Sequence, residues 1–196
     1  MTTNPRRGRG RRPAQDVRRD VLAAVADLLF TEGMAGFTID KVAARSGVSK
    51  VTIYKWWASR GAVAVEAYFA RYAQTIVFED TGDVAVDLTN QIGVMIRAFR
   101  GRAGQVMAEL VGQAQLDPHL AEMLRRQWIQ PRREITAGVL RRAIDRGQLR
   151  ADVDLELLMD QLYGPLYYRL VLAHQPLVPS LADGLVRAAL DGARPR

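Results

Sequence analysis

The chain has 196 residues, no cysteine and a formal net charge of +7, and 48% of its residues are hydrophobic. This length supports one core, or one small domain beside a larger one, and the missing cysteines exclude disulfides and thiolate metal sites. No apolar run approaches the length of a membrane-spanning helix, and the charged N-terminus lacks the apolar stretch of a signal peptide. We therefore expect a cytoplasmic protein.

The positive charge is concentrated at the N-terminal end. Residues 1–15 carry five arginines and no acidic residue, whereas residues 38–60 carry five basic residues against one aspartate, a balance of +4. Subtracting these two contributions from +7 leaves −2 for the rest of the chain. This asymmetry is typical of a polyanion-binding module joined to a body that need not touch nucleic acid.

Residues 1–15 have nothing apolar to bury, which predicts a disordered basic arm. Its arginines Arg9, Arg11 and Arg12 resemble a hook for a narrow minor groove. The alternative is a solvated tail that only raises non-specific affinity, and the sequence leaves both interpretations open.

A first helix is predicted from Asp16, because apolar residues recur from there at three- and four-residue spacing. Gly33 and Gly36 end it. The next segment, residues 38–57, reads TIDKVAARSGVSKVTIYKWW and has the spacing of a helix-turn-helix. Gly47 stands where the tight turn between two short helices needs a residue that tolerates a positive φ.

Both short helices begin at typical N-cap residues, Thr38 and Ser49, each within a hydrophobic staple. Turning the apolar residues inward leaves Lys50, Thr52 and Tyr54, together with Lys55, on or near the outer face of the second helix. A helix of this size fits a major groove.

The remaining sequence predicts further helices and no strand of any length. One helix begins at Ser59, and two more span about 84–100 and about 103–115. The next opens at Asp117-Pro118 and is interrupted at Pro131 before Ile135–Arg146. The last two span Leu155–Ala173 and Ser180–Leu190. The chain is thus predicted to be all-α with about nine helices. It is divided into a disordered basic arm (1–15), a helix-turn-helix DNA-binding domain (16–60) and a helical effector-binding and dimerisation domain (61–196).

Several short runs resemble the tetracycline-repressor (TetR/AcrR) family of bacterial transcriptional regulators. They are Phe30-Thr31-Glu32-Gly33, Phe37-Thr38-Ile39, the run from Val42 to Ser49, Thr52-Ile53-Tyr54 and the pair Ser59-Arg60. The run from Asp117 to Leu177 also resembles one C-terminal subfamily. The resemblance implies a homodimer that binds a palindromic double-stranded DNA operator, usually to repress, and that a small apolar or amphipathic ligand releases.

Carried over by position, the resemblance assigns a set of residues to the DNA interface: Thr38, Ser49, Lys50, Val51, Thr52, Tyr54, Lys55, Trp56 and Arg60. Family members often carry histidine or arginine, then phenylalanine, then proline at about positions 56–58, where this chain has Trp56-Trp57-Ala58. We expect Trp57 in the core, and whether Trp56 touches DNA stays open.

Pro165 follows Gly164 within the helix predicted over Leu155–Ala173, where proline removes a hydrogen bond and kinks the helix. A kink can open a cavity. The candidate ligand-binding residues near it are Met95, Phe99, Met107, Leu110, Met123, Trp128, Tyr163 and Tyr167. The alternative for these residues is ordinary core packing.

The last two predicted helices carry more apolar residues than one-sided burial needs, which predicts a dimeric four-helix bundle. The candidate interface residues are Leu158, Leu162, Leu166, Leu170, Leu181, Leu185 and Ala189. Some of them must instead face the body's own core.

Catalysis finds little support. Three of the four serines are predicted caps and the fourth precedes the turn, and the two histidines, His119 and His174, lack a partner at a spacing typical of a metal site or a triad. We therefore expect no catalytic residue, no metal and no cofactor. The alternatives to a ligand-responsive repressor are a constitutive or architectural DNA-binding protein, or an activator, without an effector, and more remotely a helical enzyme.

Overall fold

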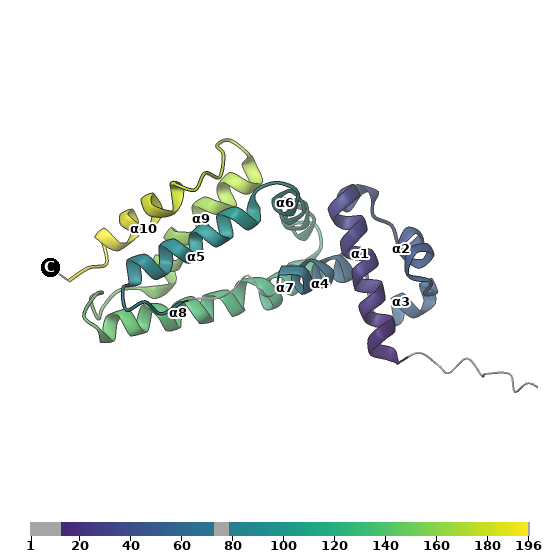
Figure 1. The fold of residues 1–196 in the computed structure, drawn as a ribbon, viewed down its shortest axis with the longest axis horizontal. Coiled ribbons are helices and arrows are strands. Elements are labelled where there is room, and N and C mark those ends of the chain that lie inside the picture. Colours follow the sequence, from purple (N-terminus) through teal and green to yellow (C-terminus); the bar gives the residue numbers. More distant parts are fainter. Residues whose placement is uncertain (1–12, 73–78, 196) are drawn as a thin grey trace, which may run out of the picture.

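The computed structural model describes residues 13–72 and 79–195 (Figure 1). All regular secondary structure in this part of the chain is helical, which confirms the predicted all-α class. Within these residues ten α-helices form, and two of them join through a π-helical turn, so that nine continuous helical segments result. None of the described helices is long and apolar enough to cross a membrane. The predicted arm, with Arg9, Arg11 and Arg12, lies outside the described residues.

The N-terminal head consists of α1 (Ala14–Gly36), α2 (Ile39–Ser46) and α3 (Lys50–Trp56). Helix α1 lies between the two short helices and the rest of the molecule (Figure 1). As predicted, Gly33 ends the regular part of α1, since its φ of 75° is left-handed.

The body is formed by the remaining helices, which are connected to the head through α4. They are α4 (Arg60–Tyr72), α5 (Val84–Phe99), α6 (Arg102–Ala114), α7 (Pro118–Leu124), the π-helical turn η2 (Arg125–Ile129), α8 (Gln130–Asp145), α9 (Leu155–Leu172) and α10 (Leu181–Asp191). Helix α5 packs against α8, α9 and α10, and α6 packs against both α1 and α9. Helix α6 thereby connects the head with the centre of the body.

The predicted interruption at Pro131 is wrong, because the backbone stays helical from α7 through the π-helical turn to α8. In η2 the Gln130 N–H bonds the Arg125 carbonyl five residues back, which is the π-helical pattern. Pro131 then stands in the first turn of α8, directly after the π-helical turn. The extra residue in the π turn resets the register just before the proline. Helix α9 likewise continues through Pro165.

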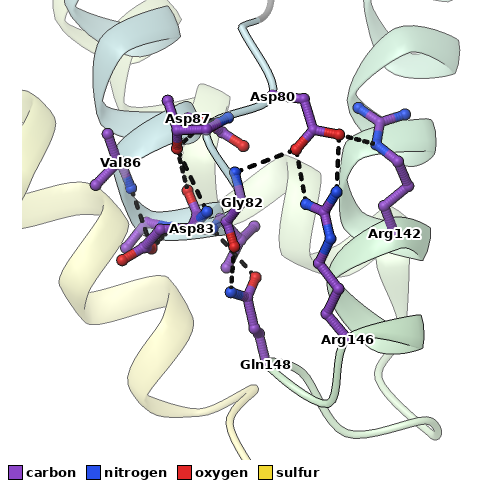
Figure 2. Close-up of polar contacts among 11 residues, drawn as sticks. Asp80, Gly82, Asp83, Val86, Asp87, Arg142, Arg146 and Gln148 are labelled. Carbon is purple, nitrogen blue, oxygen red and sulfur yellow. Dashed lines mark hydrogen bonds and ion pairs between the residues drawn. The ribbon is translucent and has the colours of Figure 1, made fainter.

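The segment before α5 is fastened to the end of α8 by a polar cluster (Figure 2). Asp80 accepts hydrogen bonds from both terminal nitrogens of Arg146, at 2.7 and 2.9 Å, and its Oδ2 lies 3.2 Å from Arg142 Nε. The hydrogen bond from Arg146 is the main reason why the pKa of Asp80 falls to about 2. Gln148, which follows α8, donates to the Gly82 carbonyl at 2.7 Å and holds the same segment.

Candidate nucleic-acid interface and body cavity

The two short helices of the head begin and end as the sequence predicts. The Thr38 hydroxyl accepts the Lys41 N–H at 3.2 Å, and the Ser49 hydroxyl accepts the Thr52 N–H at 3.2 Å. Gly47 caps α2 with a φ of 69°, a conformation that favours glycine. These caps set where α3 starts, and so fix which of its residues face outward.

The inner side of this motif is fully packed. Val42, Val48 and Ile53 are buried, and Trp57 is buried just beyond the end of α3. The Trp57 indole N–H donates to Glu66 of α4 at 2.8 Å, which anchors the end of α3 to the body. The prediction that Trp57 belongs to the core is confirmed.

The outer side of α3 is open to solvent. Val51 is 69% exposed and Tyr54 is 52% exposed, and the exposed residues Lys50 and Lys55 stand on the same helix beside them. Lys50 forms an ion pair with Asp40 of α2, so its position is defined by the neighbouring helix. Two large exposed hydrophobic side chains beside two lysines are unusual on a solvated helix and typical of a contact surface.

Thr52 and Trp56 flank this exposed face and are both half-buried. The Thr52 hydroxyl lies 2.9 Å from the Ser49 hydroxyl, so the two side chains form one hydrogen-bonded pair at the start of α3. The Trp56 ring meets the Trp57 ring edge to face, with centroids 5.6 Å apart. Trp56 therefore keeps one side accessible while the other packs on the core.

Arg60 stands at the start of α4, a position at which the sequence predicts a contact with a DNA phosphate. Its Nη1 donates to the Phe37 carbonyl at 3.1 Å, and its guanidinium stacks near the Phe37 ring. The side chain thus joins the start of α4 to the residue before the Thr38 cap. This hydrogen bond uses one of the guanidinium donors, and the DNA contact of Arg60 stays a prediction.

A cavity of about 210 Å³ opens in the body between α5, α8 and α9. Three of the predicted ligand residues line it, namely Met95, Tyr163 and Tyr167. The other five do not line it. Phe99, Met107, Leu110 and Trp128 are buried in the core, and Met123 is half-buried against it. The burial of Phe99, Met107, Leu110 and Trp128 agrees with the alternative of core packing.

The sequence prediction missed the other residues that line the cavity: Ile129, Arg132, Arg133, Asp160 and Gly164. A signal for Arg132 was present, since it precedes the buried Thr136, Val139 and Ala143 at spacings of four, seven and eleven residues. An arginine on the buried stripe of an amphipathic helix is uncommon, because burying its charge is costly, and it therefore indicates a functional use of that charge.

Hydrogen bonds fix the aromatic wall of the cavity. The Tyr163 hydroxyl lies 2.9 Å from the Thr136 hydroxyl and donates to Gln91 Oε1 at 3.2 Å. The Tyr167 hydroxyl accepts the Trp128 indole N–H at 2.6 Å. Burial raises the pKa of Tyr163 to about 12 and also raises the pKa of Tyr167, so both remain neutral donors at physiological pH.

The predicted dimer residues divide into two groups. Leu158, Leu162, Leu166 and Ala189 are buried within the protomer's own core and offer no surface, so their assignment to an interface is corrected. Leu170, Leu181 and Leu185 are half-buried. The large apolar side chains that α9 leaves exposed are instead Leu157, Tyr168, Val171 and Leu172. An interface that includes Leu170, Leu181 and Leu185 therefore stays a prediction.

No three His, Asp or Glu side chains are placed to hold a metal ion within residues 13–72 and 79–195. His119 is exposed on α7, and the His174 ring lies against the Tyr168 ring at a tilt of 58°, with ring centroids 4.5 Å apart.

A capped pair of short helices that presents a basic, partly apolar face defines a DNA-binding regulator of the helix-turn-helix class. Comparison with known proteins gives the family. The family described as "Bacterial regulatory proteins, tetR family" matches residues 21–67, and "Tetracyclin repressor-like, C-terminal domain" matches residues 78–189. The chain belongs to the TetR family of transcriptional regulators.

Individual relatives agree with this assignment. The HTH-type transcriptional regulator YdeS of Bacillus subtilis is 36% identical over 94% of this chain and 93% of its own length. The DNA-binding transcriptional repressor TetR of Mycobacteroides abscessus is 29% identical over 78% of this chain and 80% of its own length. The crystal structure of the TetR family transcription regulator SCO0332 is similar with a TM-score of 0.79 and 44% identity, covering 92% of this chain and all of that one.

Proposed function

We propose that the protein is a homodimeric repressor that binds a palindromic operator through α3 and is released from it by a small molecule bound in the body. The observation that carries the proposal is the exposed face of α3, where Val51, Tyr54 and two lysines project from a helix that is firmly capped and packed on its other side. The name of the Mycobacteroides abscessus relative, a transcriptional repressor, supports the direction of regulation. Binding to the chromosome places the protein in the cytoplasm.

The contacts with DNA divide by chemistry. Lys50 and Lys55 supply charge for phosphates, and the Tyr54 hydroxyl donates to a phosphate oxygen while its ring covers the backbone. Val51 and the methyl group of Thr52 are placed to meet thymine methyl groups in the major groove. Ser49 and Thr38 stand at helix starts, where backbone N–H groups favour a phosphate.

The dimer forms through the outer sides of α9 and α10. On α9 the exposed positions Leu157, Gly164, Tyr168 and Leu172 follow one another at near-helical spacing. On α10 the small residues Gly184 and Ala188 are exposed. Small residues allow two helices to approach closely, and the large apolar ones at the ends of the stripe gain from burial.

The structural change caused by ligand binding is transmitted to the head through α6. At the end of α1, the Glu109 carboxylate accepts the Met34 N–H at 2.7 Å, and Arg102 Nε donates to the Phe30 carbonyl at 3.1 Å. A Cβ atom on Gly33 would lie 2.6 Å from the Arg102 guanidinium, so these side chains enclose the end of α1 closely. Because α6 also packs on α9, which lines the cavity, a small shift of α6 changes the orientation of α1 and α3.

Footprinting of the purified protein on the DNA that flanks its own gene tests the proposal. We expect two protected half-sites related by symmetry, and a dimer mass in analytical ultracentrifugation. Lys55→Ala weakens binding to every sequence alike, because it removes a phosphate contact. Arg126→Ala is the matched control, since Arg126 is an exposed arginine of η2 in the body. Equal losses for both variants, or a monomeric protein on DNA, would contradict the proposal.

A further inference from the structure

A buried arginine that forms no ion pair with an acid among the described residues lies beside the body cavity. Arg132 is only 8% exposed and its guanidinium stacks on the Trp128 ring. Its Nη1 donates to the Trp128 carbonyl at 3.4 Å, a long hydrogen bond, and the ionisable groups near enough to influence it are Tyr167, Tyr68 and Tyr163. In the described part of the chain no carboxylate forms an ion pair with it.

The neighbouring arginine, in contrast, has acidic partners. Arg133 forms ion pairs with Glu156 and with Asp160, the latter at 2.6 Å. Both acids near the cavity are therefore already paired with Arg133, and neither forms an ion pair with the guanidinium of Arg132. Burial lowers the pKa of Arg132 to about 10, which still leaves it charged at neutral pH. An unpaired buried charge is costly, so its retention calls for a role other than stability.

The other walls of the cavity define the rest of a ligand. Met95 and Ile129 provide apolar surface. The Tyr167 hydroxyl accepts the Trp128 N–H, and no residue among those described accepts its own hydrogen, which leaves that donor available to a ligand. A volume of about 210 Å³ corresponds to about seven water molecules, which suits a small molecule.

We propose that this cavity binds a small organic acid, with its carboxylate on Arg132 and the Tyr167 hydroxyl and its apolar part against Met95 and Ile129. A guanidinium offers two parallel N–H donors that match the two oxygens of a carboxylate. The single charge of a carboxylate matches the single charge of the Arg132 guanidinium, whereas a phosphate monoester at about −1.5 to −2 would bring more negative charge close to Glu156 and Asp160. Only one part of this inference rests on the proposed function, namely that the bound acid is the effector that releases the protein from its operator.

Direct binding to the full-length wild-type protein tests the charge requirement. The probes are three acids, each with its neutral amide as a matched control: benzoate and benzamide, phenylacetate and phenylacetamide, and hexanoate and hexanamide. We expect at least one acid to raise the melting temperature and to bind about 10- to 100-fold more tightly than its amide in calorimetry at about pH 7.5. Equal binding within every pair, or no binding by any acid at millimolar concentration, overturns the proposal.

A substitution then assigns the preference to Arg132. Arg132→Met keeps much of the length of the side chain and removes the charge, and we expect the acid-over-amide preference to disappear while the amide binds as before. We also expect the ligand-free melting temperature to equal or exceed that of the wild type, because an unpaired charge is no longer buried. Arg142→Met is the control, since Arg142 lies on the same helix, pairs with Asp80 and does not line the cavity.

A persisting preference in Arg132→Met would overturn the assignment. If that variant fails to fold, the comparison of acids and amides on the wild type still decides the proposal. Operator binding without ligand is measured in parallel. A protein that binds acids but no operator would overturn the repressor proposal and leave the cavity inference intact. A protein that binds an operator but no acid would overturn the cavity inference and leave the repressor proposal intact.

Discussion

The head and the body use polar side chains in opposite ways. In the head, the buried side of α3 is apolar, with Ile53 at its centre, and the lysines lie on the exposed side together with Val51 and Tyr54, so this division follows from helical spacing. In the body, Arg132, Tyr163 and Tyr167 point inward and line a cavity shared by three helices. A surface site is thus encoded within one short segment, whereas an interior site depends on contacts between segments far apart in the sequence.

The largest effect should come from breaking the packed side of α3. Ile53→Ala removes a side chain with no exposed surface, and we expect a loss of about 2–5 kcal/mol in the free energy of unfolding together with a loss of operator binding. Urea denaturation followed by circular dichroism measures the first effect and fluorescence anisotropy the second.

Val51→Ala is the matched control, two residues away on the same helix and largely exposed. We expect its unfolding free energy to change by no more than about 0.5 kcal/mol while operator affinity falls. If Val51→Ala destabilised the protein as much as Ile53→Ala, the division of α3 into a buried and an exposed side would be wrong.

The next effect concerns the connection between the two regions. Glu109→Ala leaves the Met34 N–H without its acceptor, and we expect a loss of about 1–3 kcal/mol in stability and a weaker response of operator affinity to ligand. Glu109→Gln keeps an acceptor oxygen at the same place and should preserve most of both properties. Anisotropy titrations with and without ligand measure the response. A ligand response that survives in Glu109→Ala would exclude this hydrogen bond from the coupling.

A smaller effect tests base reading by the head. Thr52→Ala should relax the preference at one position in each half-site, by about 1 kcal/mol, because the methyl and hydroxyl groups meet a base edge. Thr52→Ser retains the hydroxyl that pairs with Ser49 and removes only the methyl group. Binding to a set of single-base operator variants measures the preference. Unchanged selectivity in both variants would assign Thr52 to the helix cap alone.

Much of the head was predictable because its determinants are local. The caps at Thr38 and Ser49 and the turn at Gly47 each depend on a few neighbouring residues, and all are found where the sequence places them. The hydrogen bond from Arg60 to the Phe37 carbonyl was not predicted, because the two residues are distant in sequence and no spacing rule connects them.

The body was predictable in its helices but not in its surfaces. Helix α9 is apolar on nearly all sides, so periodicity could not separate the core side, with Leu162, from the exposed side, with Leu157. The cavity was only partly predicted because aromatic and methionine residues fill cores and line pockets alike. The residue that distinguishes a pocket from a core here is charged, and Arg132 was missed because arginine is usually a surface residue.

The smallest effect that we expect concerns the exposed cluster that fastens the segment before α5 to α8. Hydrogen bonding to Arg146 lowers the pKa of Asp80 from 3.8 to about 2 in the folded protein, so the folded state binds this proton less readily than the unfolded state. The stabilisation by Asp80 is therefore complete above the unfolded pKa and is lost as the pH falls from there toward about 2. Asp80→Asn should lower the melting temperature slightly at about pH 7, and the difference from the wild type should shrink at about pH 3. Asp152→Asn, at a more exposed ion pair, controls for the loss of one surface carboxylate. A difference that stays constant between the two pH values would mean that Asp80 stabilises the segment through hydrogen bonds that do not require its charge.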